Sequence, residues 1–357
     1  MALLWCDIPD RSQGLYGTNS GSWTTEGLYA SFSFLFYDDP DPEIGSAGKV
    51  MGIVGSSGDR EARFILPAAR TEVGMGCRVY LANIPIETDR AVAAHVYRNA
   101  SNVAIISVVI STTGSIQIRS GDYKGTILAE TAQDVITAKA WRHLESEITF
   151  NATTGTAKVW LEGVQVLDAT SLNTGLVSCA QVAWRCDAGI TNGRTNTYYK
   201  DIFVRDGEGS TNNSQIGPTT VYLLRPNADV SSGWTRSSGF TDFELLDEAP
   251  PNDTDYISAA STLPSPSIMD LSDLPSDVVS VRGLISVVRA IKTDSGDGKV
   301  QVSLSPDDGA TWDTGADNAV TTTESYYHDV SELSSGTASA WTPTEVNNAT
   351  IRINRTI

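Results

Sequence analysis

Apolar and polar side chains alternate most regularly along residues 141–168. Leu144 and Ile148 lie on one parity of this stretch, whereas Glu145 and Glu147 lie on the other. In a strand, successive side chains point to opposite faces, so this alternation is typical of a strand with one buried face. We therefore expect a half-buried strand to begin this stretch.

The same stretch predicts two turns. A polar loop at 151–156 follows the first strand, and alternation resumes over 157–161. The pair Glu162-Gly163 suits a two-residue hairpin leading into 164–167, because both turn positions need a positive φ. Three consecutive strands thus form an antiparallel meander.

The pattern W-x-x-x-E-x-x-I-x-F, a loop, and G-x-x-x-V-W-L-x-G over 141–163 resembles the laminin-G/concanavalin A-like jelly roll. In that family a hairpin of this kind carries a residue like Trp141 into the sandwich. The resemblance implies a jelly-roll sandwich over residues 1–206. Glycan binders, glycosidases, lyases and inert structural modules all use this fold, so function has to be argued from a site.

Short β-rich runs fill most of the remaining chain, and none shows a helical stripe. Gly, Ser, Asn or Pro separates them at a spacing of about 8–14 residues, which favours a sandwich over βαβ units. Residues 103–110 are apolar on both parities and predict a central strand. The other expected strands are 28–37, 49–54, 62–66, 77–82, 91–98, 115–119, 126–129, 181–184, 197–206, 278–292, 299–305 and 350–355.

The length of 357 residues fits two domains. Residues 207–217 are expected to be a Gly/Ser/Asn-rich linker that few contacts cross, and a second, smaller β-sandwich is expected over 218–357. Within that half, 227–277 carries five prolines and few large apolar side chains, so we expect it to remain extended and not to continue a ladder. We therefore predict that 1–205 folds alone, whereas 216–357 is the assembly half.

A second resemblance covers roughly residues 199–260. It is carried by IGPTTV at 216–221, LRPNAD at 224–229, Trp234 and DEAPPNDTDYI at 247–257. These segments look like the region that joins a concanavalin A-like domain to a second β-domain in virion proteins of tailed bacteriophages. The resemblance implies a structural protein of the particle, either a tail-tip or fibre protein or a head spike or decoration. Such a protein is made in the bacterial cytoplasm, attaches to tail or capsid, and self-associates, by analogy as a trimer.

The net charge of the chain disfavours two classes of partner. The formal net charge is −18, which disfavours nucleic acid and anionic membranes and otherwise serves solubility. The four cysteines, Cys6, Cys77, Cys179 and Cys186, are too scattered for a disulfide framework or a zinc site, so free buried thiols are expected. The first residues, MALLWCDIPDR, lack a basic leader and a long apolar run, so we expect neither a signal peptide nor a membrane span.

An acidic loop is the candidate metal site. It comprises Asp38, Asp39, Asp41 and Glu43, whose hard oxygen atoms suit Ca²⁺. The D-x-D-x-D-G spacing of a calcium loop is absent, so a solvated turn is the favoured interpretation. We expect no other cofactor.

A structural motif lies in the second half. The sequence SPDDGATW at 305–312 fits the Asp-box S-x-D-x-G-x-T-W, which comprises Ser305, Asp307, Gly309, Thr311 and Trp312. Its expected role is to stabilise a hairpin: the Ser and Asp side chains bond turn amides, and the Trp pins the turn to the sheet.

Catalysis is not predicted. Glu145 and Glu147 share a strand face, about 7 Å apart, and are the nearest match to a glycosidase dyad. The E-x-D-x-x-E arrangement of jelly-roll glucanases is nevertheless absent. The histidines His95, His143 and His328 lack a Ser or Cys signature, so we expect them to pack rather than to act as bases. A polysaccharide-degrading glycosidase or lyase is the least favoured function.

Glycan binding is the main alternative to a virion structural role. Trp160 and Trp184 would be stacking platforms for sugar rings if they faced solvent. Tryptophan in a two-sheet sandwich more often packs in the core. A host-glycan receptor-binding module therefore depends on where these two rings point.

Overall fold

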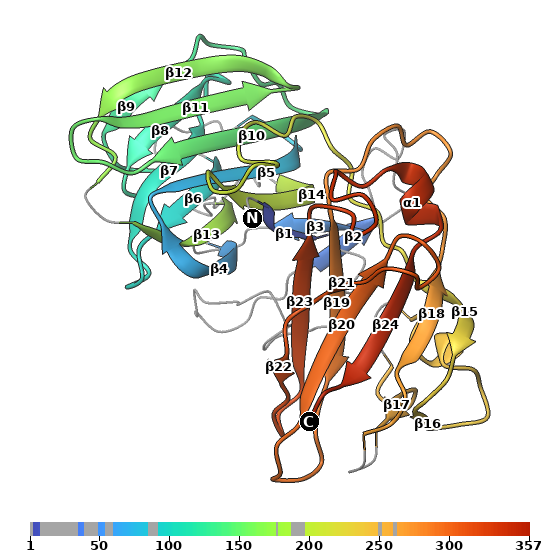
Figure 1. Ribbon diagram of the computed structural model, residues 1–357. Coiled ribbons are helices and arrows are strands. Elements are labelled where there is room, and N and C mark those ends of the chain that lie inside the picture. The colour runs from blue at the N-terminus through green and yellow to red at the C-terminus, as the bar shows by residue number, and fades with distance from the viewer. Residues whose placement is uncertain are drawn as a thin grey trace. The chain divides into compact units, whose positions relative to one another are not determined.

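The computed structural model describes residues 3–7, 35–38, 49–53, 60–84, 92–175, 178–186, 197–248, 252–259 and 263–357. The chain divides into two compact units, Met1–Val221 and Tyr222–Ile357. Nearly all regular structure is β (Figure 1), as the sequence predicts. No helix in the described ranges is long and apolar enough to cross a membrane.

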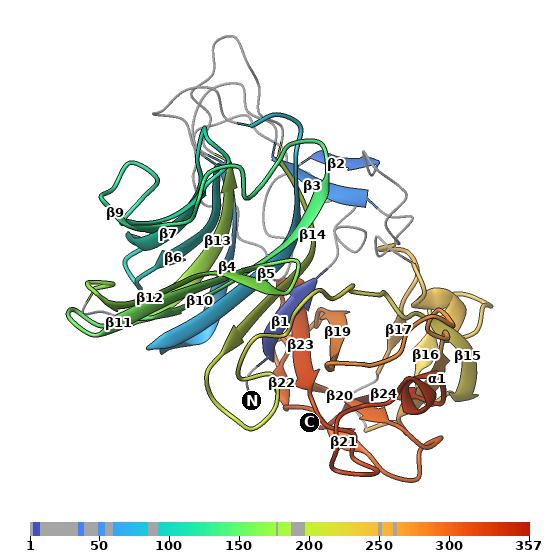
Figure 2. The ribbon, with the colours of Figure 1, turned by 90° about the horizontal axis from the view of Figure 1, so that it is seen from above.

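Two antiparallel sheets form the first unit and lie as two layers in Figure 2. The eight-stranded sheet has the order β12-β11-β10-β5-β14-β3-β2, with β1 paired to β14. Its strands are β1 (Leu3–Asp7), β2 (Leu35–Asp38), β3 (Lys49–Ile53), β5 (Glu72–Leu81), β10 (Trp141–Thr149), β11 (Gly155–Leu161), β12 (Val164–Leu172) and β14 (Thr197–Asp206). The six-stranded sheet has the order β4-β13-β6-β7-β8-β9. Its strands are β4 (Arg60–Arg70), β6 (Val92–Arg98), β7 (Ala104–Ile110), β8 (Ile116–Ser120), β9 (Ile127–Glu130) and β13 (Cys179–Cys186).

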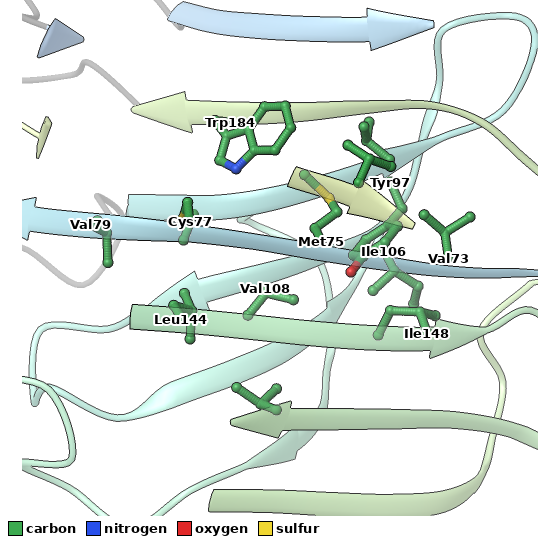
Figure 3. Close-up of a cluster of buried hydrophobic side chains, with 14 of the residues drawn as sticks. Val73, Met75, Cys77, Val79, Tyr97, Ile106, Val108, Leu144, Ile148 and Trp184 are labelled. Atoms are coloured by element: carbon green, nitrogen blue, oxygen red, sulfur yellow. The ribbon is translucent and has the colours of Figure 1, made fainter. Parts of the chain in front are cut away.

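The core of the first unit lies between these sheets. Alternate residues of β5, including Met75 and Cys77, meet Ile106 and Val108 of β7, and all four are fully buried (Figure 3). Burial of both faces over the second half of β7 matches the central strand expected at 103–110. The sandwich has jelly-roll architecture.

The antiparallel meander predicted for residues 141–168 is confirmed. In β10 and β11, Leu144 pairs with Leu161 and Ile148 with Ala157. The turn residues Glu162 and Gly163 have φ of 51° and 79°, as a two-residue hairpin that matches the strand twist requires.

The second unit is a smaller β assembly. Its six-stranded sheet has the order β15-β18-β24-β20-β21, with β22 paired to β20, and two-stranded sheets pair β16 with β17 and β19 with β23. The strands are β15 (Pro226–Ser231), β16 (Thr235–Arg236), β17 (Ile257–Ser258), β18 (Ser267–Leu271), β19 (Leu284–Ala290), β20 (Lys299–Ser305), β21 (Asp313–Thr314), β22 (Asn318–Ala319), β23 (Ser325–Ser331) and β24 (Thr350–Arg355). Two apolar clusters stabilise it, one around Trp341 and one around Met269.

One expectation for this half is wrong. Residues 227–277 do contribute ladders, because β18 pairs with both β15 and β24. Of its prolines, the described Pro264, Pro266 and Pro275 lie outside the strands, so they break no central hydrogen bond. A short helix, α1 (Pro343–Asn347), also forms, where Thr342 and Glu345 make a capping box after the buried Trp341.

Candidate functional site

The two tryptophans proposed as glycan platforms are buried. Trp184 in β13 is fully buried in the sandwich core (Figure 3), and Trp160 in β11 is 7% exposed. A pyranose stacks only on a ring face that solvent reaches, so this role is wrong for both residues in this fold. The alternation in the sequence assigns each tryptophan ring to one face of its strand, but it does not show which neighbouring residues cover that face.

The acidic loop falls mostly outside the described residues. Asp39, Asp41 and Glu43 are not described, and only the backbone of Asp38 is, at the end of β2. Among the described residues, no group of three or more His, Cys, Asp or Glu side chains is placed to hold a metal ion.

Glu145 and Glu147 lie on the outer face of the eight-stranded sheet, where they flank a buried arginine. Arg205 Nη2 lies 3.2 Å from Glu145 Oε1 and 2.9 Å from Glu147 Oε2. Lys158 Nζ also reaches Glu147 Oε1 at 2.8 Å. The two carboxylates expected as the nearest approach to a catalytic dyad are therefore partners in one charge network.

Two glycines of β5 allow this network to form. A Cβ on Gly74 would lie 2.7 Å from Arg205 Cζ, and one on Gly76 would lie 2.1 Å from the Phe203 ring. Because glycine has no side chain, Arg205 lies flat across the sheet and reaches both carboxylates.

The pKa values of the two carboxylates move in opposite directions. Burial raises the pKa of Glu145, although the Gly217 amide and Arg205 act against it. Burial also acts to raise the pKa of Glu147, but hydrogen bonds from Lys158 and Arg205 outweigh it and hold that pKa below its ordinary value. Pairs with divergent pKa values occur in acid–base catalysis. Glu145 is nevertheless completely buried, so no substrate reaches it.

The linker is docked onto this face. Ile216 N donates to Glu145 Oε1 at 3.0 Å, and Gly217 N donates to Glu145 Oε2 at 2.9 Å. Gln215 Nε2 donates to the Gly163 carbonyl at 2.8 Å. These bonds make the linker part of the first unit, which extends to Val221.

The two described histidines of the first unit are buried and neutral. His143 stacks on Phe203 with ring centroids 6.1 Å apart, and neither of its ring nitrogens has a hydrogen-bond partner. Burial, followed by the nearby charge of Arg78, lowers the pKa of His143 to about 4. Both features agree with packing rather than base catalysis.

His95 belongs to a polar chain inside the core. Its Nε2 lies 3.3 Å from Cys77 Sγ, and its Nδ1 lies 2.6 Å from Ser146 Oγ, which also contacts the Tyr97 hydroxyl at 2.7 Å. Burial lowers the pKa of His95 to about 3 and raises that of the Cys77 thiol far above its ordinary value. This constellation resembles a nucleophile–base pair in composition, but it is sealed from water and remains uncharged. Cys77 and Cys179 are free and buried, as expected.

The Asp-box residues form a hydrogen-bonded turn in the second unit. Asp307 accepts from the Thr311 amide at 2.8 Å and from the Thr311 hydroxyl at 2.9 Å, while Ser305 Oγ accepts from the Gly309 amide at 2.8 Å. Gly309 has φ of 89° and lies against Trp312, whose ring stacks under the Arg352 guanidinium at 4.2 Å. These contacts stabilise the hairpin.

A second cluster of aromatic and cationic side chains lies on the outer face of the six-stranded sheet. Val96, Val109 and Ala183 form a small, fully buried apolar cluster there, and the half-buried Tyr123 packs against it. Arg185 Cζ lies 5.2 Å from the Tyr123 ring centroid, and Lys124 Nζ lies 5.1 Å from it. Cations at these distances over a ring interact favourably with it.

Arg119 completes this surface from β8. Its Nε and Nη2 donate to Gln117 Oε1 at 2.8 and 2.6 Å, and its Nη1 donates to the Gly125 carbonyl at 3.4 Å. We call Gln117, Arg119, Tyr123, Lys124 and Arg185 the Tyr123 cluster. Local sequence patterns do not indicate this cluster, because GDYKG at 121–125 is typical of an ordinary turn and Arg185 is 62 positions from Tyr123 (185 − 123).

No protein-family model and no curated protein matches the chain. Solved structures with partial similarity include the carbohydrate-binding module CBM66 from Bacillus subtilis, at 14% identity and a TM-score of 0.35 over 54% of this chain and 99% of the module. Domain 4 of AbnA, a GH43 extracellular arabinanase from Geobacillus stearothermophilus in complex with arabinotriose, gives 15% identity and a TM-score of 0.37 over 57% of this chain and 93% of that domain. A sialidase gives 9% identity and a TM-score of 0.33, with only 15% of its length matched. Likeness at this level says nothing of function.

Proposed function

We propose that the first unit is a non-catalytic glycan-binding module whose contact surface is the Tyr123 cluster. One observation carries this proposal: a partly exposed tyrosine ring packs on a buried apolar cluster, with Lys124 and Arg185 close to the ring and the hydrogen-bonded Arg119 and Gln117 on the neighbouring strand β8. An aromatic face suits the apolar face of a pyranose, and planar guanidinium and amide groups suit its oxygens.

The absence of turnover is part of the proposal. It is supported by Glu145 and Glu147, which are both bound by Arg205, and by His95, which is uncharged inside the core. Incubation with host polysaccharides should release no product. Turnover that Glu147→Gln abolishes would make the protein a glycosidase or lyase instead.

A glycan array probed with the full chain tests the binding proposal. We expect saturable binding that Tyr123→Ala weakens by about tenfold, the order of one lost aromatic contact. Tyr256→Ala is the matched control, because Tyr256 is a 52% exposed tyrosine of the second unit. A full chain that binds no glycan on the array, or one whose binding Tyr123→Ala leaves unchanged, would overturn the proposal.

A second candidate function is a structural role in a tailed-phage virion, as a tail-tip or fibre protein or as a head spike or decoration. The resemblance over 199–260 favours this role. The linker also supports it, because its amides hold the connecting segment against the first unit. In this role the chain self-associates, by analogy as a trimer, and both functions combine in a particle that adheres to its host. Mass spectrometry of purified particles decides this role, because absence from the particle excludes it. Light scattering of the full chain tests the trimeric state, and a monomeric mass would exclude it.

A further inference from the structure

The hairpin of β8 and β9, which carries Tyr123, has balanced charges and an exposed apolar side chain. Its charged side chains are the cations Arg119 and Lys124 and the acids Asp122 and Glu130, and all of them are exposed or partly exposed. Ile127 of β9 lies directly opposite Arg119 in the ladder and is 44% exposed. Because the charges balance, this hairpin suits a neutral ligand that offers hydrogen-bonding groups and a small apolar contact.

The side-chain amide of Gln117 is held between Arg119 and Glu130. Gln117 Oε1 accepts from Arg119 Nε at 2.8 Å and from Arg119 Nη2 at 2.6 Å, while Gln117 Nε2 donates to Glu130 Oε1 at 2.7 Å. A guanidinium only donates and an ionised carboxylate only accepts, so the amide lies in one orientation. Arg119 and Glu130 are therefore a matched donor and acceptor for a planar amide group.

Further hydrogen bonds fix both members of this pair. Ser115 Oγ donates to Glu130 Oε1 at 2.5 Å, and Arg119 Nη1 donates to the Gly125 carbonyl at 3.4 Å. The hydrogen bonds from Gln117 and Ser115 lower the pKa of Glu130, so its carboxylate is ionised at neutral pH. A surface that is ordered before binding loses less entropy when it captures a ligand.

Both members of the pair also keep hydrogen-bonding capacity for a ligand. In the described part of the chain, the three hydrogen bonds of Arg119 leave some of its guanidinium N–H groups without a protein partner. Both hydrogen bonds to Glu130 end on Oε1, which leaves Oε2 as an acceptor. Glu130 is exposed and Arg119 is partly exposed. A donor, an acceptor and the apolar Ile127 are thus accessible on neighbouring positions of the hairpin.

We infer that the ligand of the Tyr123 cluster is a neutral glycan that contains N-acetylated sugars. This inference rests on the proposed glycan-binding function. An acetamido group has a carbonyl that accepts from Arg119, an N–H that donates to Glu130, and a methyl group that packs on Ile127. The sugar ring that carries it stacks on Tyr123. A hydroxyl at the same position offers no methyl group and no amide, so Glu130 and Ile127 discriminate between the two kinds of sugar.

Calorimetry on the full chain with two neutral oligosaccharides tests the inference. Chitotetraose and cellotetraose share the same ring and the same linkage, but each sugar of chitotetraose carries an acetamido group where cellotetraose has a hydroxyl. We expect chitotetraose to bind at least about tenfold more tightly, the order of one added hydrogen bond to a charged group. Equal affinities, or array binding confined to glycans without an acetamido group, would overturn the inference and keep glycan binding. Binding of neither oligosaccharide nor any arrayed glycan would overturn both proposals.

The variant Glu130→Gln assigns the recognition to this hairpin. Glu130 is exposed, so folding should be preserved, which the circular dichroism spectrum checks. We expect the variant to lose about tenfold in affinity for chitotetraose and to bind cellotetraose as the wild type does, because only the acetamido N–H uses this carboxylate. Glu208→Gln is the charge-matched control, since Glu208 is an exposed glutamate of the linker.

Three results would refute the inference. Equal weakening of both oligosaccharides by Glu130→Gln would show that this carboxylate has a structural role alone. An effect of the same size from Glu208→Gln would show that the loss reflects net charge and not the hairpin. Equally tight binding of tetraglycine would show that the hairpin recognises amide groups of peptides and not those carried on sugars.

Discussion

The outer faces of the two jelly-roll sheets both carry hydrogen-bonded arginines, but these arginines have different partners. On the eight-stranded sheet, Arg205 lies between Glu145 and Glu147, and the linker amides complete the network. On the six-stranded sheet, Arg119 bonds amide and carbonyl oxygens, while Arg185 lies by the Tyr123 ring. Arg205 is paired with carboxylates within the chain, which stabilises the structure, whereas the Arg119 guanidinium is oriented by neutral acceptors. Variants of the first face should therefore affect stability, and variants of the second should affect binding.

The strongest test of this contrast is Arg205→Met. It leaves Glu145 and Glu147 buried without their shared cation, and breaking a buried pair in this way costs about 3–5 kcal/mol of unfolding free energy. Denaturant unfolding measures the loss. Lys158→Gln is the matched comparison on the same network, and because Lys158 Nζ lies at the solvent-exposed edge, it should cost less than about 1 kcal/mol. Similar losses in the two variants would show that burial does not govern this face.

Removal of the linker should give the next largest effect. A fragment of residues 1–221 keeps the Ile216 and Gly217 amides on Glu145, whereas residues 1–205 lack them. Losing hydrogen bonds to a buried carboxylate and the burial of Ile216 should lower the unfolding free energy by about 3 kcal/mol. We therefore expect residues 1–205 to fold alone, but with a lower unfolding free energy than residues 1–221. Equal denaturation midpoints for the two fragments would mean that the linker contributes nothing.

Gly76→Ala tests the packing that allows the network to form. Its new methyl group would overlap the Phe203 ring, so we expect a loss of about 1–3 kcal/mol in thermal or denaturant unfolding. Gly239→Ala is the control, because no atom lies within 4 Å of a Cβ at that position. An unfolding midpoint of Gly76→Ala equal to that of the wild type would contradict the close approach of the Phe203 ring to Gly76.

The smallest expected effect is a pH dependence of stability. The pKa of His143 is about 4 in the fold and about 6.5 in an unfolded chain, so below pH 6.5 the unfolded chain binds a proton that the folded one excludes. Stability should fall by about 1–2 kcal/mol for this group between pH 6.5 and 5, and His95 acts in the same direction. His143→Phe should make the pH profile of the denaturation midpoint shallower by this amount. An unchanged profile would show that folding does not shift the pKa of His143.

The parts of the fold that could be predicted from sequence are those with clear alternation. The β10–β12 meander and the strands β14, β20 and β24 follow from it directly, because an antiparallel sheet with one covered face imposes a period of two. β15 and β18 escaped prediction, since prolines next to short strands hide that period.

The candidate site was much less predictable. Alternation placed Glu145 and Trp160 on one face, but it could not show that the linker and Arg205, some 60 residues further on, would cover that face. Tyr123 and Arg185 meet only because β8, β7, β6 and β13 are neighbours in the sheet. Contacts of this kind depend on strand order, which a local pattern does not contain.

The polar chain through Cys77 has a practical consequence for measuring how the sandwich opens. Only a thiolate reacts with alkylating reagents, and the Cys77 thiol is fully buried with its pKa strongly raised, so the folded state protects it. Its alkylation under native conditions therefore requires the two sheets to separate. The rate at which mass spectrometry detects the modified Cys77 peptide reports the free energy of that opening at one chosen point inside the jelly roll, without any introduced label.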